Sequence, residues 1–279
     1  MANRAYDLRG RTVLITGPAR GIGAEAARQL VARGARLSLA GLEPERLEAL
    51  AGDLGPDAAW FEVDVRDPGA LERAMAGTVE RFGGIDVVIA NAGIRPPVAT
   101  VSSVEPEAFE RVIEINLLGV WRTVRAALPH VIERQGYVLC VASLAAAAHA
   151  PLLAPYNAAK AGVEAFGNSL RGELDHHGVA VGVAYFGFID TDMVREGQAE
   201  GERRLPGRGS TVFGRPLPVS RAGEAIVRGI EHRARRVVAP RYIYPALIAP
   251  GVIPRVLDAL VRHGRAGEMV RAAERDPER

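Results

Sequence analysis

Three side chains near the middle of the chain are spaced so that together they could move a proton. Tyr156 is followed four residues later by Lys160, and Ser143 lies thirteen residues before the tyrosine. A free phenol has a pKa of about 10, but an ammonium one helical turn away stabilises the phenolate and lowers that pKa. A nearby hydroxyl can orient a substrate oxygen. The spacing therefore predicts an acid–base phenol, and chance placement on a helix face is the simpler alternative.

Alternating apolar and helical segments must position these side chains. Strands are predicted at 11–16, 35–41, 58–65, 85–93, 136–143, 179–186 and 236–240. Helices are predicted at 21–34, 43–54, 68–83, 105–134, 155–178 and 220–235, and a polar stretch rich in Gly and Pro at 197–218. The strands are continuous apolar runs, which is typical of a parallel sheet with helices on both faces. The sequence thus predicts a three-layer, doubly wound α/β domain of about seven strands.

The first predicted strand leads directly into a glycine-rich turn and a helix, "TGPARGIGAEAA". Gly17, Gly21 and Gly23 allow the backbone to turn tightly and to approach a pyrophosphate closely. The N–H groups and the positive dipole end of the helix that follows favour an anion at this place. Because the pattern follows a strand and opens a helix, it favours a dinucleotide site on a Rossmann-type sheet over a turn that serves packing alone.

The motifs and their order resemble the short-chain dehydrogenase/reductase family over residues 10–193. "TGPARGIG", "ANAG" at 90–93, Asn116, Ser143 and "YNAAK" carry the resemblance. It implies an NAD(P)-dependent oxidoreductase whose catalytic residues are Ser143, Tyr156, Lys160 and Asn116. In that family Tyr156 would be the general acid/base, Ser143 would orient the substrate oxygen and Lys160 would hold the nicotinamide ribose. Asn116 would hold a water that links Lys160 to solvent.

The resemblance also implies a set of cofactor contacts. Asp64 would approach the adenine, and Asn91 would support the central sheet and line the cofactor groove. The full set is Gly17, Arg20, Gly21, Ile22, Gly23, Gly41, Asp64, Val65, Asn91, Ala92, Gly93, Tyr156, Lys160, Gly187, Ile189 and Thr191. Phe186 stands where the family usually has Pro, a departure that concerns the geometry of the loop more than the chemistry.

The choice between NAD and NADP depends on the residues after the second predicted strand. An Asp or Glu there binds the ribose 2′-OH of NAD, whereas a nearby Arg accommodates the 2′-phosphate of NADP. Gly41 and Leu42 occupy these positions, so neither signal is present. Arg20 resembles the basic residue of NADP-preferring members, while Glu43 is placed either to fold back onto the ribose or to start the next helix. The sequence favours NADP and leaves NAD as the alternative.

The expected substrate is a hydrophobic ketone or aldehyde, or the corresponding alcohol, because apolar segments follow Ser143 and the sixth strand. His149 would line the pocket or lie on the surface. In the charged segment "GERRLPGRG", Arg203, Arg204 or Arg208 would contact substrate if the segment is a lid, and solvation is the simpler reading. Two other functions share this fold: a non-catalytic dinucleotide-sensing or scaffold protein, and an epimerase or dehydratase.

Composition limits the partners and the compartment. The 279 residues are 48% apolar and 24% charged with a formal net charge of +2, and no basic stripe indicates nucleic acid. The lone cysteine, Cys140, lies in an apolar run, which predicts a buried thiol and a reducing, cytoplasmic setting. No Cys/His cluster has metal-ligand spacing. No window supplies the roughly 20 apolar residues of a membrane span.

The predicted domain boundaries are 1–240 for the dinucleotide-binding and catalytic domain and 241–279 for a C-terminal appendage packed on it. The apolar part of the appendage is broken by prolines and would add to the core or to a subunit contact. The alternative is docking on a membrane surface, with Arg241, Arg255 and Arg262 flanking the apolar patch. The family resemblance implies a homodimer or homotetramer packed through the long helices.

Overall fold

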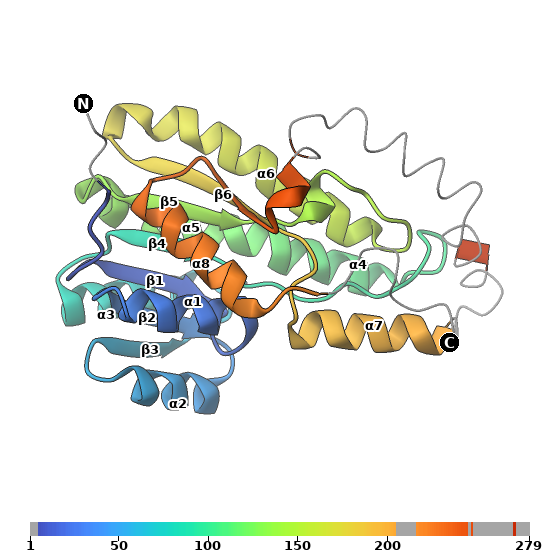
Figure 1. Ribbon diagram of the computed structural model, residues 1–279, viewed down its shortest axis with the longest axis horizontal. Coiled ribbons are helices and arrows are strands. Elements are labelled where there is room, and N and C mark those ends of the chain that lie inside the picture. Colours follow the sequence, from blue (N-terminus) through green and yellow to red (C-terminus); the bar gives the residue numbers. More distant parts are fainter. Residues whose placement is uncertain (1–4, 205–215, 245–246, 248–269, 272–279) are drawn as a thin grey trace.

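A seven-stranded parallel sheet forms the centre of the molecule (Figure 1). The computed structural model describes residues 5–204, 216–244, 247 and 270–271. The strands are β1 (Thr12–Thr16), β2 (Arg36–Gly41), β3 (Ala58–Glu62), β4 (Val87–Ala90), β5 (Tyr137–Val141), β6 (Ala180–Phe186) and β7 (Arg236–Ala239). Their order across the sheet is β3-β2-β1-β4-β5-β6-β7. The predicted fold class is confirmed.

Helices cover both faces of the sheet (Figure 1). On one face lie α1 (Gly21–Val31), α2 (Pro44–Leu54) and α8 (Val219–Glu231). On the other lie α3 (Pro68–Phe82), α5 (Gly119–Glu133) and α6 (Ala154–Leu174). Successive residues of a strand point to opposite faces, so Ile15 packs in the first layer and Leu14 in the second. Both faces are therefore buried, which explains the continuous apolar runs.

The order of the strands reverses between β1 and β4. From β1 the chain adds β2 and β3 on one side, then crosses back to β4 and adds β5 to β7 on the other. The loops after β1 and β4 consequently leave the sheet in opposite directions and open a crevice at the carboxyl edge, where doubly wound sheets bind ligands. Gly17 follows β1 and Asn91 follows β4, so both predicted contacts are placed at this crevice.

The long helical stretch predicted at 105–134 is interrupted by a π-helical turn. It comprises α4 (Pro106–Ile113), the π turn η1 (Glu114–Leu118) and α5. The π turn contains Asn116, and such turns within helices are frequent at functional sites. The periodicity of the sequence does not reveal the extra residue, because the apolar spacing on either side remains helical.

Helix α7 (Asp192–Arg204) was not predicted from the sequence. It covers the start of the predicted polar stretch and the first part of the charged segment. Its first turn is stabilised by Arg195, which pairs with Asp190 and Asp192 at 2.9 Å. The side chains of Arg203 and Arg204, and all of Arg208, lie outside the described residues, so a contact with substrate stays a prediction.

The predicted boundary at residue 240 also stays a prediction. Strand β7 ends at Ala239 and a short 3₁₀ turn, η5 (Arg241–Ile243), follows. Most of the predicted appendage 241–279, including Arg255 and Arg262, lies outside the described residues. Within the part of the chain that the structure describes, no helix is long and apolar enough to cross a membrane.

Candidate active site

The glycine turn between β1 and α1 adopts backbone angles that favour glycine. Gly17 and Gly21 have φ values of 66° and 58°. A Cβ at Gly17 would lie 2.8 Å from Ala92 Cα, and one at Gly23 would lie 2.8 Å from Asn91 Nδ2. The sequence analysis assigned these glycines to the approach of a pyrophosphate. The structure adds that Gly17 and Gly23 are needed so that the loop after β4 can pack on the turn.

The N-terminus of α1 has no side-chain cap. Arg20 is the N-cap residue and makes no capping hydrogen bond, and the first turn contains no acidic residue. The partial positive charge of this helix end therefore has no compensating side chain at its own start. Ile22 lies in this first turn and packs partly against the core. An uncapped helix end behind a glycine turn is suited to hold a phosphate.

Thr16 joins the two loops at the crevice. Its hydroxyl accepts hydrogen bonds from the N–H groups of Asn91 and Ala92 at 3.1 and 3.2 Å. The Asn91 amide in turn donates to the carbonyls of Thr16 and Gly17 at 3.0 and 3.1 Å. Sequence reasoning missed Thr16. Its signal was a polar residue at the end of the strand, just after the apolar run Val-Leu-Ile and just before Gly17.

Lys160 is a buried ammonium whose hydrogen-bond partner is a main-chain carbonyl. It is 4% exposed, and its Nζ donates to Val141 O at 2.9 Å. Burial lowers the pKa of this ammonium to about 8. Val141 is the last residue of β5, so the sheet and α6 together fix Lys160 at the carboxyl edge.

Tyr156 and Ser143 come together as predicted, but the effect of Lys160 on the phenol is not the predicted one. Burial raises the pKa of the Tyr156 phenol, and the hydrogen bond with the Ser143 hydroxyl opposes this rise. Nζ of Lys160 lies over the Tyr156 ring, 5.7 Å from its centroid, and hydrogen-bonds Val141 instead of the phenol. The expectation that Lys160 lowers this pKa below 10 is therefore wrong for the geometry seen here, because desolvation dominates.

Asn116 fixes the chain just after the Asn-Ala-Gly segment. It is fully buried, its Oδ1 accepts from the Ile94 N–H at 2.7 Å, and its Nδ2 donates to the Ile94 carbonyl at 3.0 Å. A Cβ at Gly93 would lie 3.0 Å from Asn116 Oδ1 and 3.8 Å from Lys160 Nζ. The π turn thus brings Asn116, Gly93 and Lys160 to one place.

The residues that would select the cofactor lie at the ends of β2 and α1. Gly41 is buried and Leu42 is 56% exposed. Arg20 and Glu43 form an ion pair at 3.6 Å, with side chains that are 52% and 38% exposed. The two candidates that the sequence left as alternatives are therefore partners. An exposed pair of this kind is weak, so either side chain is available to a ligand at small cost.

Asp64 and Val65 follow β3 and serve different purposes. Asp64 receives two hydrogen bonds from Arg66 Nε at 3.1 and 2.9 Å, and this pairing lowers the pKa of its carboxyl group. Val65 is buried, and a Cβ at Gly119 would lie 2.7 Å from its Cγ2. Of these two residues, Asp64 presents a polar group at this edge, while Val65 packs against the start of α5.

The segment after β6 contains Phe186, which stands where the family usually has Pro. This residue is buried and pairs with Ala239 of β7, and its carbonyl accepts a hydrogen bond from Ser143 Oγ at 3.4 Å. Gly187 continues the ladder by donating to Ala239 O at 2.9 Å. Ile189 is buried and bridges to Leu217. Thr191 reaches the glycine turn, since its Cγ2 would lie 3.3 Å from a Cβ at Gly21.

Two further residues singled out in the sequence are His149 and Cys140. His149 is exposed, and one ring nitrogen lies 3.1 Å from the Ala146 carbonyl. Cys140 is fully buried, and burial raises the pKa of its thiol to about 12, which fits the predicted inert thiol. Among the described residues no group of His, Cys, Asp or Glu has the arrangement of a metal site.

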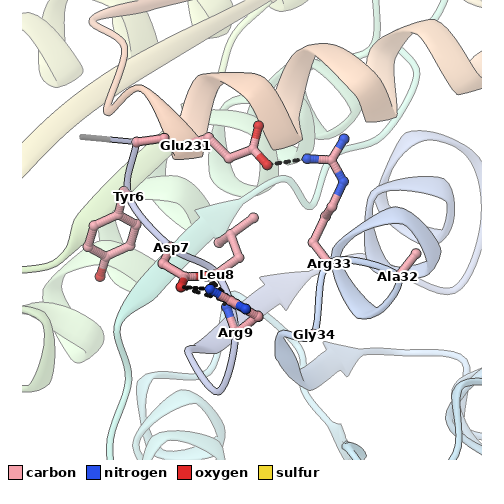
Figure 2. Close-up of a pocket in the computed structure, with 9 residues that line it drawn as sticks. Tyr6, Asp7, Leu8, Arg9, Ala32, Arg33, Gly34 and Glu231 are labelled. Atoms are coloured by element: carbon pink, nitrogen blue, oxygen red, sulfur yellow. Dashed lines mark hydrogen bonds and ion pairs between the residues drawn. The ribbon is translucent and has the colours of Figure 1, made fainter. Parts of the chain in front are cut away.

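A surface hollow lies at the opposite end of the sheet (Figure 2). It has a volume of about 590 Å³ and is lined by residues 5–9, by the segment after α1 and by Glu231. Figure 2 shows that its polar rim is internally paired, Asp7 with Arg9 and Arg33 with Glu231. These residues precede β1, β2 and β7, so the hollow is separate from the carboxyl edge where the catalytic groups gather.

A doubly wound sheet with a glycine turn and a Ser–Tyr–Lys cluster at its carboxyl edge defines a class of nicotinamide-dependent oxidoreductases. The sequence profile described as short chain dehydrogenase matches residues 11–201. The chain belongs to the short-chain dehydrogenase/reductase family, and it is an oxidoreductase of the kind that binds NAD(P).

Named relatives agree with this assignment. The chain is 32% identical to dehydrogenase/reductase SDR family member 7B of Bos taurus, over 94% of this chain and 84% of the relative. It is 32% identical to the 3-oxoacyl-acyl-carrier-protein reductase of Escherichia coli, over 68% and 78% of the two chains.

Two solved structures share the fold and part of the sequence. Levodione reductase matches with a TM-score of 0.77 and 28% identity, over 83% of this chain and 96% of that one. The 3-ketoacyl-acyl-carrier-protein reductase of Brucella melitensis, solved with NADH, matches with a TM-score of 0.75 and 26% identity, over 84% and 99% of the chains.

Proposed function

We propose that the protein reduces a hydrophobic ketone or aldehyde to the corresponding alcohol, with Tyr156 as the general acid. The observation that carries the proposal is the convergence of Tyr156, Ser143 and Lys160 at the carboxyl edge, beside Gly93. Burial raises the pKa of the Tyr156 phenol, so the hydroxyl is protonated at neutral pH. A protonated phenol can donate to the oxygen of a carbonyl substrate, which suits reduction.

The residues at the crevice fit a dinucleotide. The positive φ angles of Gly17 and Gly21 and the uncapped start of α1 would hold the pyrophosphate. Asp64 would contact the adenine, and Asn91 and Gly93 would line the groove with Val65, Ala92, Gly187, Ile189 and Thr191. When bound, the nicotinamide supplies the hydride that reduces the carbonyl carbon.

The catalytic side chains would then have separate tasks. Ser143 donates a hydrogen bond to the substrate oxygen and orients it toward Tyr156. Lys160, held by the Val141 carbonyl, would bind the nicotinamide ribose. Asn116 holds the loop at Ile94 in place and would support the water through which Lys160 reaches solvent.

The amount of cofactor consumed for each substrate molecule distinguishes this function from the two alternatives, an epimerase or dehydratase and a non-catalytic sensing or scaffold protein. A carbonyl reductase consumes one reduced nicotinamide for each substrate, whereas an epimerase needs only catalytic amounts. A sensing or scaffold protein binds the cofactor without turnover. We would incubate the protein with NADPH or NADH and a panel of apolar ketones and aldehydes, following nicotinamide absorbance and alcohol formation. Loss of cofactor that matches alcohol formation is expected; cofactor binding without consumption would contradict the proposal.

For the cofactor we propose NADP, with Arg20 as the contact for the 2′-phosphate. No acidic residue stands at Gly41 or Leu42 to repel this group, and the ion pair of Arg20 with Glu43 is exposed and weak. Glu43 on the ribose hydroxyl, and hence NAD, is the alternative that the same ion pair supports. A side-by-side fluorescence titration with NADPH and NADH distinguishes the two.

The substitution Glu43→Gln, measured in the same titration, tests which of the two side chains contacts the cofactor. If Arg20 binds the 2′-phosphate, removing its competing partner should tighten NADPH by roughly two- to fivefold and leave NADH unchanged. If Glu43 binds the ribose, NADH should weaken instead. Arg20→Gln is the matched variant, and it should weaken NADPH alone. NADPH affinity that Arg20→Gln does not change would contradict the assignment of Arg20.

We further propose that the protein acts in the cytoplasm as a homodimer or homotetramer. Cys140 is a free, buried thiol, which is compatible with a reducing compartment. Sedimentation velocity would measure the oligomeric state, and a monomer at micromolar concentration would contradict it.

A further inference from the structure

An ion pair joins helix α7 to the loop that follows β4. The Arg95 guanidinium pairs with the Glu200 carboxylate, and these residues are 105 positions apart in the sequence. The two side chains are 32% and 15% exposed. By comparison, the Arg195 side chain of the same helix is 59% exposed, and its partners Asp190 and Asp192 are close to it in the sequence. The Arg95–Glu200 pair is therefore a shielded, long-range contact.

The two attachment points of α7 lie at different parts of the crevice. Arg95 follows Ile94, whose N–H and carbonyl are both held by Asn116. Near the other end of the helix, Thr191 packs on Gly21 of the glycine turn. Helix α7 thus runs from the proposed pyrophosphate site to the loop next to Lys160, and Figure 1 shows it projecting beyond the sheet.

Helix α7 differs from several other helices in its relation to the hydrophobic core. None of the described side chains of α7 belongs to either hydrophobic core, in contrast to those of α1, α5 and α8. Polar contacts and the contacts near its ends therefore contribute to the position of α7. A shielded ion pair is stronger than an exposed one, because less water competes with it.

We propose that Arg95 and Glu200 are positioning residues that hold α7 across the mouth of the active site and so shape the substrate site. The proposal rests on the proposed reductase function. Breaking the pair removes one of the contacts at the far end of α7 while Ser143, Tyr156 and Lys160 keep their own partners. Substrate binding should weaken, and turnover at saturating substrate should change little.

Steady-state kinetics with matched variants test this. Glu200→Gln should raise KM for the carbonyl substrate by roughly tenfold with kcat within about twofold of wild type. Glu196→Gln removes an exposed carboxylate one turn earlier on the same helix and should leave both constants unchanged. Arg95→Glu and Glu200→Arg should each raise KM, and the double variant R95E/E200R should recover most of the loss.

A second measurement does not need turnover. Trypsin should cleave after Arg195 several-fold faster in Glu200→Gln than in the wild-type protein, as measured by mass spectrometry, because a released helix opens more often. Equal cleavage rates, or no recovery in R95E/E200R, would overturn the role of the ion pair. A wild-type protein without reductase activity that still shows the difference in cleavage would instead count against the proposed function.

Discussion

The buried charged groups at the two ends of the parallel sheet have different kinds of partner. At the amino end, Asp86 is 6% exposed and receives the Arg11 guanidinium at 2.6 Å and the Thr12 N–H at 2.9 Å. At the carboxyl end, Lys160 is 4% exposed, and its ammonium donates a hydrogen bond to the carbonyl of Val141. One buried charge has an opposite charge beside it, and the other has a neutral dipole.

This difference distinguishes a buried polar group that stabilises the fold from one that serves the reaction. An ionised group that is buried beside an opposite charge and a hydrogen bond costs little stability. A buried ammonium beside a carbonyl costs more, which is why its pKa falls to about 8. Proteins keep such unfavourable arrangements mainly where function requires them. The contrast supports the carboxyl edge as the site of chemistry and the amino edge as a place of fold stability.

The largest expected effect is on the turnover number, when the tyrosine at the carboxyl end of the sheet is replaced. Tyr156→Phe should lower kcat by about 10³-fold, because it removes the proton donor, and should leave cofactor affinity nearly intact. Steady-state assays and nicotinamide fluorescence measure the two quantities. Turnover like that of wild type would remove Tyr156 from proton transfer and with it the contrast between the two ends.

Lys160→Met tests the cost of the buried ammonium. Turnover and cofactor affinity should both fall, while the free energy of unfolding at neutral pH should rise by up to about 3 kcal/mol. The folded-state pKa of about 8 lies below the ordinary value of 10.5, so the folded chain binds fewer protons between these pH values. Wild-type stability should accordingly rise, relative to Lys160→Met, as the pH increases from about 8 to 10.5.

Urea denaturation at pH 7 and at pH 10 measures this difference for Lys160→Met. A gap between the two proteins that is the same at both pH values would mean that Lys160 is not destabilised by burial. Other groups titrate in this range in both proteins, so only the difference between wild type and variant is informative.

Asp86→Asn should have the opposite effects to Lys160→Met, a loss of stability with little change in activity. It removes the charge opposite Arg11 and weakens the bond from Thr12, so the free energy of unfolding should fall by about 2 kcal/mol. Cofactor affinity and kcat should remain within about twofold of wild type, since the residue lies at the far end of the sheet. Urea denaturation and steady-state assays check both parts. A large loss of kcat in a folded variant would show that the two ends are coupled.

Tyr137→Phe is the smallest change and the direct counterpart of Tyr156→Phe. The Tyr137 hydroxyl donates to the Ala234 carbonyl at 2.7 Å, and burial raises the pKa of its phenol as well. Removing it should lower stability by about 1 kcal/mol and leave kcat unchanged. A loss of activity comparable to that of Tyr156→Phe would show that a buried phenol alone does not identify the catalytic tyrosine.

Much of the fold was predictable, because its signals are local. Apolar runs, helical spacing and the glycine turn each lie within one continuous stretch of sequence, and they placed all seven strands and the catalytic elements. Helix α7 was missed, since its sequence is polar and lacks the apolar periodicity that marks a buried helix face. The π turn around Asn116 was missed because one extra residue hardly alters helical periodicity.

The sequence by itself determined the alternation of strands and helices, the glycine turn and the spacing of Ser143, Tyr156 and Lys160. These features depend on the chain's local geometry, in which a helical turn of four residues places two side chains on one face. Only the tertiary structure decided the pairing of Arg20 with Glu43, the link of Arg95 to Glu200 and the partner of Lys160. It also decided that burial raises the pKa of Tyr156. Long-range contacts and the exclusion of water arise only when distant segments pack, so no short stretch of sequence encodes them.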